Sequence, residues 1–392
     1  MERTDISKLH VDILRAIMLR VPLESLVKCI PVCRKWRSTI RGEGFKNLYW
    51  AQSMTRPRLL IEYSRGTFTQ PSDKLFQSVY QQEEPLFSSG IKQMLISSPP
   101  LDYRMFSAPQ RGLVCLGYET KFVLCNPGTN RGKALPECER LRPVEESEII
   151  CFFGYDEVTQ VFKFLVSEIG ALLFTSEYSH KPLMPQQVFT VKLAELESMK
   201  EKSWRVIECQ HNHVPVTKSL CLNGALYYGA KSLVETDKSM IISFDLGSEK
   251  FTIIDLPEGV KLAYVGDRLV NYNGEVCLVK DLWDVRDDGT RVYKIYVRDE
   301  SARKWREMAV VIPCLGDDVG DVRFCCAGTI GTTEELVLVF ATESVEKKGS
   351  PLVLYYDTAT KNLRLFQMEG VDENLYFTPR TFVNHYDSLL LT

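Results

Sequence analysis

The sequence contains no long hydrophobic run. Nowhere do about 18 apolar residues follow one another without a charged one, which excludes a membrane-spanning helix. The first five residues carry charges of both signs and precede no apolar stretch, so we expect no secretory leader. Without a leader, the twelve cysteines are expected to remain free thiols in a reducing compartment. We therefore predict a protein of the nucleus, the cytoplasm or both.

Ligand spacings typical of metal sites are also missing. No two cysteines form a Cys-x-x-Cys pair, and the one cluster of soft ligands is Cys209, His211 and His213. Alternation would place these three side chains on one side of a strand, but structural zinc sites draw on two separated ligand pairs. A polar loop is the favoured interpretation of this segment, and we predict no metal and no cofactor.

The motifs of common enzyme classes are absent as well. No serine stands in a Gly-x-Ser-x-Gly elbow, and residues 328–331 lack the third glycine of a dinucleotide fingerprint. The acidic turns at residues 287–288 and 317–321 lack the alternating ligands and terminal glutamate of a calcium loop. The sequence therefore predicts a protein without catalytic residues.

The net charge of −3 is small but unevenly distributed. Residues 1–50 hold ten basic and five acidic side chains, whereas the rest of the chain has an acidic excess of eight. The basic residues of the first segment alternate with apolar ones at helical spacing, which favours a solvated helix face over a nucleic-acid surface. We expect binding neither to nucleic acid nor to a membrane.

What the sequence does contain, between Leu9 and Trp50, is a helical period of apolar residues. Two adjacent rows mark the first helix: Leu9, Ile13 and Ile17, and Leu14, Met18 and Val21. Pro22 and Pro31 are each expected to open a further helix, because proline costs nothing in a first turn, and Gly42 and Gly44 to end the third. Three short helices in about forty residues are marginal alone, so we expect a partner.

After Met54 the pattern changes to short strands rich in β-branched and aromatic residues, separated by Gly, Pro, Asn and Asp. One helix is predicted in this part, over residues 192–200, with Leu193, Leu196 and Met199 in register. The fold class is therefore mainly β with a small all-α N-terminal domain. The predicted domains are residues 1–50, helical, and residues 51–392, all-β.

A weak internal repeat predicts how the strands are arranged. Asp245, Asp299 and Asp357 each follow a strand, and six residues later a large apolar residue opens the next. These aspartates are 54 and 58 residues apart, and Asn126 stands about two repeats upstream. Hairpin repeats of roughly this length are typical of a β-propeller, here of about six blades. The last strands, at 376–382 and 389–391, are expected to close the ring on the first blade; an irregular β-sandwich is the alternative.

The helical segment resembles an F-box. The family pattern of aliphatics around a Leu-Pro step, followed by Ser-Leu and Val-Cys-Lys-x-Trp, is matched in order and spacing. The matching residues are Leu9, Asp12, Ile13, Ile17, Leu19, Val21, Pro22, Ser25, Leu26, Cys29, Val32, Cys33, Arg34, Lys35, Trp36 and Ile40. His10 replaces the family's usual proline, and Pro31 is unusual before the third helix.

The remainder resembles the F-box-associated domain, of the third type, of the large plant F-box family. The matching segments are 112–115, 126–129, 135–136, 153–156, 162–165, 203–205, 222–228, 243–245 and 256–257. The last quarter matches less distinctly, at 269–274 and 304–305.

The resemblance implies a substrate-receptor subunit of a Skp–cullin–F-box ubiquitin ligase. The helical domain would bind a Skp-family adaptor, and through it cullin and the RING subunit. The β domain would hold a target protein for ubiquitination and proteasomal degradation, with its contacts on loops at one end of the ring.

By the same resemblance we assign adaptor contact to nine residues: Leu9, His10, Ile13, Ile17, Val21, Pro22, Leu26, Val32 and Trp36. An evenly weighted alternative is that some of them, Leu26 and Trp36 above all, hold the three helices together. Two other functions stay open: an F-box adaptor or regulator that delivers nothing for degradation, and a propeller enzyme, which the missing catalytic cluster disfavours.

Overall fold

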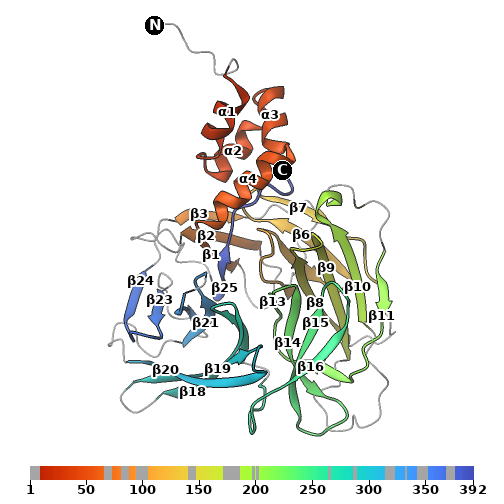
Figure 1. Ribbon diagram of the computed structural model, residues 1–392, viewed down its shortest axis with the longest axis vertical. Helices are drawn as coiled ribbons and strands as arrows, with labels where there is room; N and C mark the ends of the chain where they lie inside the picture. The colour runs from red at the N-terminus through yellow and green to blue at the C-terminus, as the bar shows by residue number, and fades with distance from the viewer. Residues whose placement is uncertain are drawn as a thin grey trace.

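The computed structural model describes residues 9–65, 73–80, 88–93, 105–139, 147–170, 186–196, 199, 203–263, 266–285, 289–313, 323–331, 333–341, 352–367 and 376–392. The acidic turns at 287–288 and 317–321 lie outside these residues. A small helical unit sits on one end of a larger body of β-sheets, above β1, β2, β3 and β7 (Figure 1). Among the described residues, no helix combines the length and the hydropathy needed to cross a membrane.

The helical unit contains four helices: α1 (Val11–Met18), α2 (Leu23–Cys29), α3 (Arg34–Arg41) and α4 (Glu43–Met54). Their apolar faces meet in one core, in which Leu14, Leu26 and Ile40 are almost fully buried. Pro22 stands directly before α2, as predicted. Pro31 does not open α3, because Cys33 is the N-cap and its sulfur accepts the backbone N–H of Trp36.

The prediction that Gly42 and Gly44 end the third helix is confirmed for Gly42 only, and a fourth helix follows. Gly42 is the C-cap of α3 and has an extended conformation, but Gly44 lies inside α4. Phe45 and Tyr49, one turn apart, bury the inner face of α4 in the core of the unit. This burial outweighs the low helix propensity of glycine, so α4 continues across the predicted domain boundary at residue 50.

Six antiparallel sheets make up the described part of the β domain. The first blade is ordered β25 (Tyr376–His385), β1 (Arg58–Arg65), β2 (Asp73–Tyr80), β3 (Ser88–Gln93). The second is β4 (Met105–Phe106), β5 (Val114–Tyr118), β6 (Lys121–Asn126), β7 (Arg131–Ala134). The third is β8 (Ser147–Asp156), β9 (Val161–Gly170), β10 (Gln186–Lys192), β11 (Arg205–Ile207).

In the fourth blade β12 (His213–Pro215) and β13 (Leu220–Leu222) both pair with β14 (Ala225–Ser232), which is followed by β15 (Ser239–Asp245) and β16 (Phe251–Asp255). The fifth blade is β17 (Arg268–Tyr272), β18 (Glu275–Val285), β19 (Arg291–Asp299), β20 (Lys304–Ile312). The sixth is β21 (Arg323–Thr329), β22 (Glu335–Ala341), β23 (Leu352–Asp357), β24 (Leu363–Gln367). The fold is a six-bladed β-propeller, not an irregular sandwich.

The ring closes as predicted, but with one strand. β25 pairs with β1, so the C-terminal strand completes the first blade and covers a sheet edge that would otherwise invite aggregation. The predicted strand at 389–391 is wrong: these residues form a turn, and Leu389 is buried in the core of the helical unit.

The predicted helix at 192–200 is also wrong. β10 extends through Lys192, which pairs with Val161, so only the 3₁₀ turn η3 (Leu193–Glu195) follows it. Leu196 and Met199 are nevertheless buried, in the core shared by the second and third blades. Their spacing of three residues predicted the burial correctly, although the described residues 193–195 form a 3₁₀ turn instead of an α-helix.

The repeated aspartates occupy equivalent places in successive blades. Asp245, Asp299 and Asp357 each end the third strand of a blade and accept a backbone N–H from the turn that leads to the fourth. Asn126 does the same at the end of β6, accepting from Gly128 and Thr129. Such turns reverse the chain within four or five residues, which explains why an aspartate or asparagine recurs at this place.

Candidate functional site

The outer face of α1 carries an exposed apolar row. The side chains of Ile13 and Ile17 are 52% and 49% exposed, whereas Leu14 and Met18, one position further along, are buried. Residues four apart lie on the same helix face, so Ile13 and Ile17 form a row that faces solvent, and Leu14 and Met18 form the adjacent row that faces the core. Apolar side chains kept in water at helical spacing favour docking against another protein.

Four other residues of the predicted contact set lie before the first residues of α1, α2 or α3, and three of them are exposed. Val32, before α3, is 61% exposed, and His10 and Pro22 are exposed. His10 is the N-cap of α1 and accepts the backbone N–H of Asp12. Leu9 is half-buried, and its carbonyl accepts a hydrogen bond from Lys35 Nζ at 2.6 Å, which holds the start of α3 against the start of α1.

The last three residues of the set are buried in the helical unit to different extents. Val21 and Trp36 are half-buried against the helical core, and Leu26 has no exposed surface at all. Leu26 therefore holds the helices together, in agreement with the alternative interpretation. The role of the other eight in adaptor contact stays a prediction.

Helix α4 adds exposed apolar area that the sequence pattern did not predict. Leu48 and Met54 are 50% and 47% exposed. The spacing of Phe45 and Tyr49 could have revealed this helix, but the glycine at position 44 argued against it.

The C-terminal tail ties the helical unit to the propeller. Leu389 is 2% exposed and packs in the helical core. Asn126, at the end of β6, donates its side-chain amide to the carbonyls of Ser388 and Leu390 at 2.8 and 2.7 Å, and Thr129 donates its hydroxyl to the carbonyl of Leu391. Residues 386–392 therefore belong to the core of one domain and to the hydrogen bonds of the other.

Charged and aromatic groups reinforce this joint. Arg58, the first residue of β1, forms an ion pair with Asp387 at 2.9 Å and lies over the ring of Tyr80. The guanidinium of Arg111 lies over the ring of Trp50 in α4, which in turn meets Tyr386 edge to face. Side chains from both domains and the tail thus fix the orientation of the helical unit.

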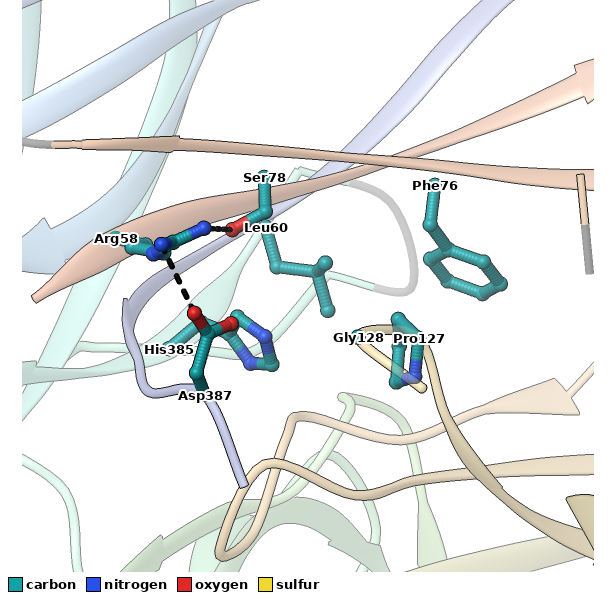
Figure 2. Close-up of a pocket in the computed structure, with 8 residues that line it drawn as sticks. All are labelled: Arg58, Leu60, Phe76, Ser78, Pro127, Gly128, His385 and Asp387. Carbon is teal, nitrogen blue, oxygen red and sulfur yellow. Dashed lines mark hydrogen bonds and ion pairs between the residues drawn. The ribbon is translucent and has the colours of Figure 1, made fainter. Parts of the chain in front are cut away.

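Figure 2 shows a pocket at the joint, lined by Arg58, Leu60, Phe76, Ser78, Pro127, Gly128, His385 and Asp387. Its volume of about 10 Å³ leaves room for about one water molecule. The pocket is part of the packing between strands and tail and does not provide a ligand site.

The predicted loop is confirmed for Cys209 and His211, which lie between β11 and β12, but not for His213, which begins β12. His213 lies in β12 and is 2% exposed; its Nδ1–H donates to the carbonyl of His211 at 2.8 Å, and Nε2 lies 2.9 Å from the Tyr228 hydroxyl. Burial raises the pKa of the Cys209 thiol and lowers the pKa of His213 to about 4. Both ring nitrogens are occupied, and no group of three metal-ligating side chains occurs within the described ranges.

Two family matches cover almost the whole chain. Residues 6–48 match the F-box domain, and residues 60–386 match the F-box associated beta propeller domain. The chain belongs to the F-box proteins with an associated β-propeller. The two matches correspond to the helical unit and the ring of blades.

Plant F-box proteins resemble the chain along its full length. The putative F-box protein At1g70970 of Arabidopsis thaliana is 38% identical and the putative F-box protein At1g70380 is 40% identical, each match covering 100% of both chains. The F-box/kelch-repeat protein At3g04660 of the same plant is 29% identical over 95% of this chain and 93% of its own. Fold, domain content and relatives agree.

Family membership gives the F-box unit its general role. The F-box domain supports binding to a Skp-family adaptor, and the combination with a propeller supports a substrate-adaptor role of the Skp–cullin–F-box type. Neither matched family is that of an enzymatic domain.

Proposed function

We propose that the protein is the substrate receptor of a Skp–cullin–F-box ubiquitin ligase. Its F-box binds a Skp-family adaptor, which connects it to cullin and the RING subunit, and its propeller holds a target protein for ubiquitination and degradation. The exposed row of Ile13 and Ile17 on an F-box carries this proposal. We place the protein in the nucleus or cytoplasm, and the free thiols of the described cysteines support a reducing compartment.

The expected energetics are sufficient for a stable complex. Full burial of an aliphatic side chain contributes about 1.5–3 kcal/mol, so half-exposed Ile13, Ile17 and Val32 would together contribute a few kcal/mol when covered. Leu9, His10, Val21, Pro22 and Trp36 would widen the contact. Association costs offset part of this gain, so loss of one central side chain should weaken binding strongly.

The first test is Ile13→Asp in the full-length chain. Covering a charge at this position without a partner costs several kcal/mol, so affinity for a purified Skp-family adaptor should fall by at least about 100-fold in a biolayer-interferometry assay. The side chain is half exposed, so the variant should fold and keep the thermal transition of the parent chain.

Val234→Asp is the matched control, because Val234 is 73% exposed between β14 and β15 of the propeller. It should bind the adaptor like the parent chain. Undiminished adaptor binding by Ile13→Asp would refute the assigned surface.

A second experiment separates a ligase receptor from a regulator that delivers nothing. Proximity labelling in plant cells, with the proteasome inhibited, should enrich a partner of the propeller with both the parent chain and Ile13→Asp. Without inhibitor, the partner should disappear only with the parent chain. A partner whose abundance is indifferent to the inhibitor would favour the regulator.

A further inference from the structure

Basic side chains from several blades meet at the centre of the ring. β17, β21 and β25 stand first in the strand order of the fifth, sixth and first blades, and β13 pairs with β14 of the fourth. Neighbours among these four strands pack against one another. The inner strands of a propeller surround its central channel. Side chains that interact across several of these blades therefore lie in or beside that channel.

Three cations interact in this way. Lys218, between β12 and β13, interacts electrostatically with Arg268 of β17 and with Arg380 of β25. Nη2 of Arg268 donates to Sγ of Cys325 in β21 at 3.1 Å, which holds its guanidinium toward the sixth blade. Lys218 thus faces residues of the fifth, sixth and first blades at once, as a group beside the axis must.

One carboxylate accompanies the three cations among the described residues that Lys218 faces. Glu62 of β1 is 2% exposed and already lies 3.7 Å from Nε of Arg380. The three cations and one carboxylate therefore leave an excess of positive charge beside the central channel, where several blades surround them.

The environment of Lys218 disfavours the protonated form of its side chain. The protein atoms that surround Lys218 at the channel displace bulk water, and together with repulsion from Arg380 and Arg268 they lower its pKa to about 7. The side chain is nevertheless accessible to solvent, so small ions can reach it. A bound anion would relieve the repulsion and restore the full charge of the lysine.

We propose that Lys218, Arg268 and Arg380 form an oxyanion site in the channel of the propeller, which takes a sulfate ion or a phosphate group. Guanidinium groups present paired N–H donors that match the oxygens of such anions, and the lysine adds a mobile third donor. The site is independent of the ligase role proposed above, because it lies in the propeller and involves no residue of the F-box.

The test uses the purified full-length chain and sodium sulfate, with sodium chloride at equal ionic strength as the salt control. Sulfate should raise the thermal midpoint of the parent chain by several degrees more than chloride does, because a ligand of the native state stabilises it. In Lys218→Met this specific increment should vanish, and the sulfate-free variant should melt at a higher temperature than the parent, since the repulsion is gone.

Lys238→Met is the matched control, an exposed lysine of the same blade paired with Glu235 at 2.7 Å. It should retain the sulfate increment. An equal increment in Lys218→Met, or none beyond that of chloride in the parent chain, would overturn the site.

The pH dependence provides a second readout. Sulfate keeps its charge between pH 6 and 8, and Lys218 gains charge as the pH falls through its pKa of about 7. Sulfate affinity should therefore be several-fold higher at pH 6 than at pH 8 in the parent chain and flat in Lys218→Met. A flat profile in the parent chain would contradict the role of the lysine.

Inorganic phosphate and glycerol phosphate, compared at pH 7, distinguish a free ion from a phosphate group on a larger molecule. Stabilisation by either, absent in Lys218→Met, supports the site; stabilisation by neither contradicts it.

Discussion

At the scale of single residues, Ile13 and Leu26 show how one apolar pattern serves two purposes. Both match the F-box pattern, yet one is 52% exposed and the other 0%. Leu26 lies where α2 packs against the other helices, and its loss would unfold the unit whatever the adaptor does. Exposure separates a contact residue from a core residue, and the sequence left this choice open for Leu26.

His213 leads to a prediction about pH. Its ring is buried and neutral, and its pKa of about 4 lies below the ordinary value of 6.5. The unfolded chain binds this proton first, so stability is complete above about pH 6.5 and decreases as the pH falls toward 4. Urea unfolding at pH 7.5 and pH 5 should show a loss of about 2 kcal/mol from this residue.

His213→Gln keeps hydrogen-bonding groups at this position without titrating. Its stability should change less between the two pH values than that of the parent chain. An identical decrease in both proteins would show that other groups cause the pH dependence.

At the scale of elements, the turn between the third and fourth strands has the same hydrogen bond in several blades. The backbone N–H of Ser248 donates to Oδ1 of Asp245 at 2.6 Å, and this hydrogen bond lowers the pKa of the carboxyl group. Equivalent bonds form at Asp299 and Asp357, where β19 and β23 end. The aspartate spacing in the sequence is therefore the spacing of the blades themselves.

Asp245→Ala should lower the free energy of unfolding by about 1 kcal/mol, because the backbone N–H groups of the turn lose their acceptor. Asp245→Asn should lose much less, since its amide oxygen can accept the same bond. Chemical denaturation of both variants measures the difference. Equal losses would mean that the charge, not the acceptor geometry, stabilises the turn.

At the scale of the whole molecule, the C-terminal tail makes the F-box and the propeller structurally dependent on each other. The tail crosses from β25 to the helical core and is held by Asn126 and Arg58 on the way. A fixed orientation between the F-box and the propeller suits the proposed receptor, which would have to hold its target at a fixed place relative to the adaptor.

Removal of residues 386–392 should make the F-box unfold at a lower temperature than the propeller. The ring should stay closed, because β25 ends at His385, while the F-box loses Leu389 from its core. Calorimetry should then show a new transition below the main one, and proteolysis should begin near residues 55–57. Leu389→Ala, with the tail otherwise intact, should lower F-box stability by about 2–5 kcal/mol.

Removal of Thr392 alone is the control and should change neither transition. A single unshifted transition after removal of the whole tail would contradict the dependence of the F-box on it.

The sequence by itself determined the first helices, the six hairpin repeats, the closing strand and the F-box pattern. Each of these is encoded by spacing between near neighbours: a helical period, an aspartate before a turn, or a motif of about forty residues. Local spacing reports which face of an element is apolar, so the exposed row of Ile13 and Ile17 was within its reach.

Only the tertiary structure decided which residues distant in the sequence pack against the apolar faces of the helices and strands. The sequence pattern predicts a strand at Leu389, but this residue packs in the core of the helical unit. Asn126 donates a hydrogen bond to the carbonyl of Ser388, 262 residues away in the sequence. Lys218, Arg268 and Arg380 are unremarkable cations until the blades bring them together. Contacts across such separations depend on how whole elements pack, and burial gained there outweighs the local preferences that a sequence displays.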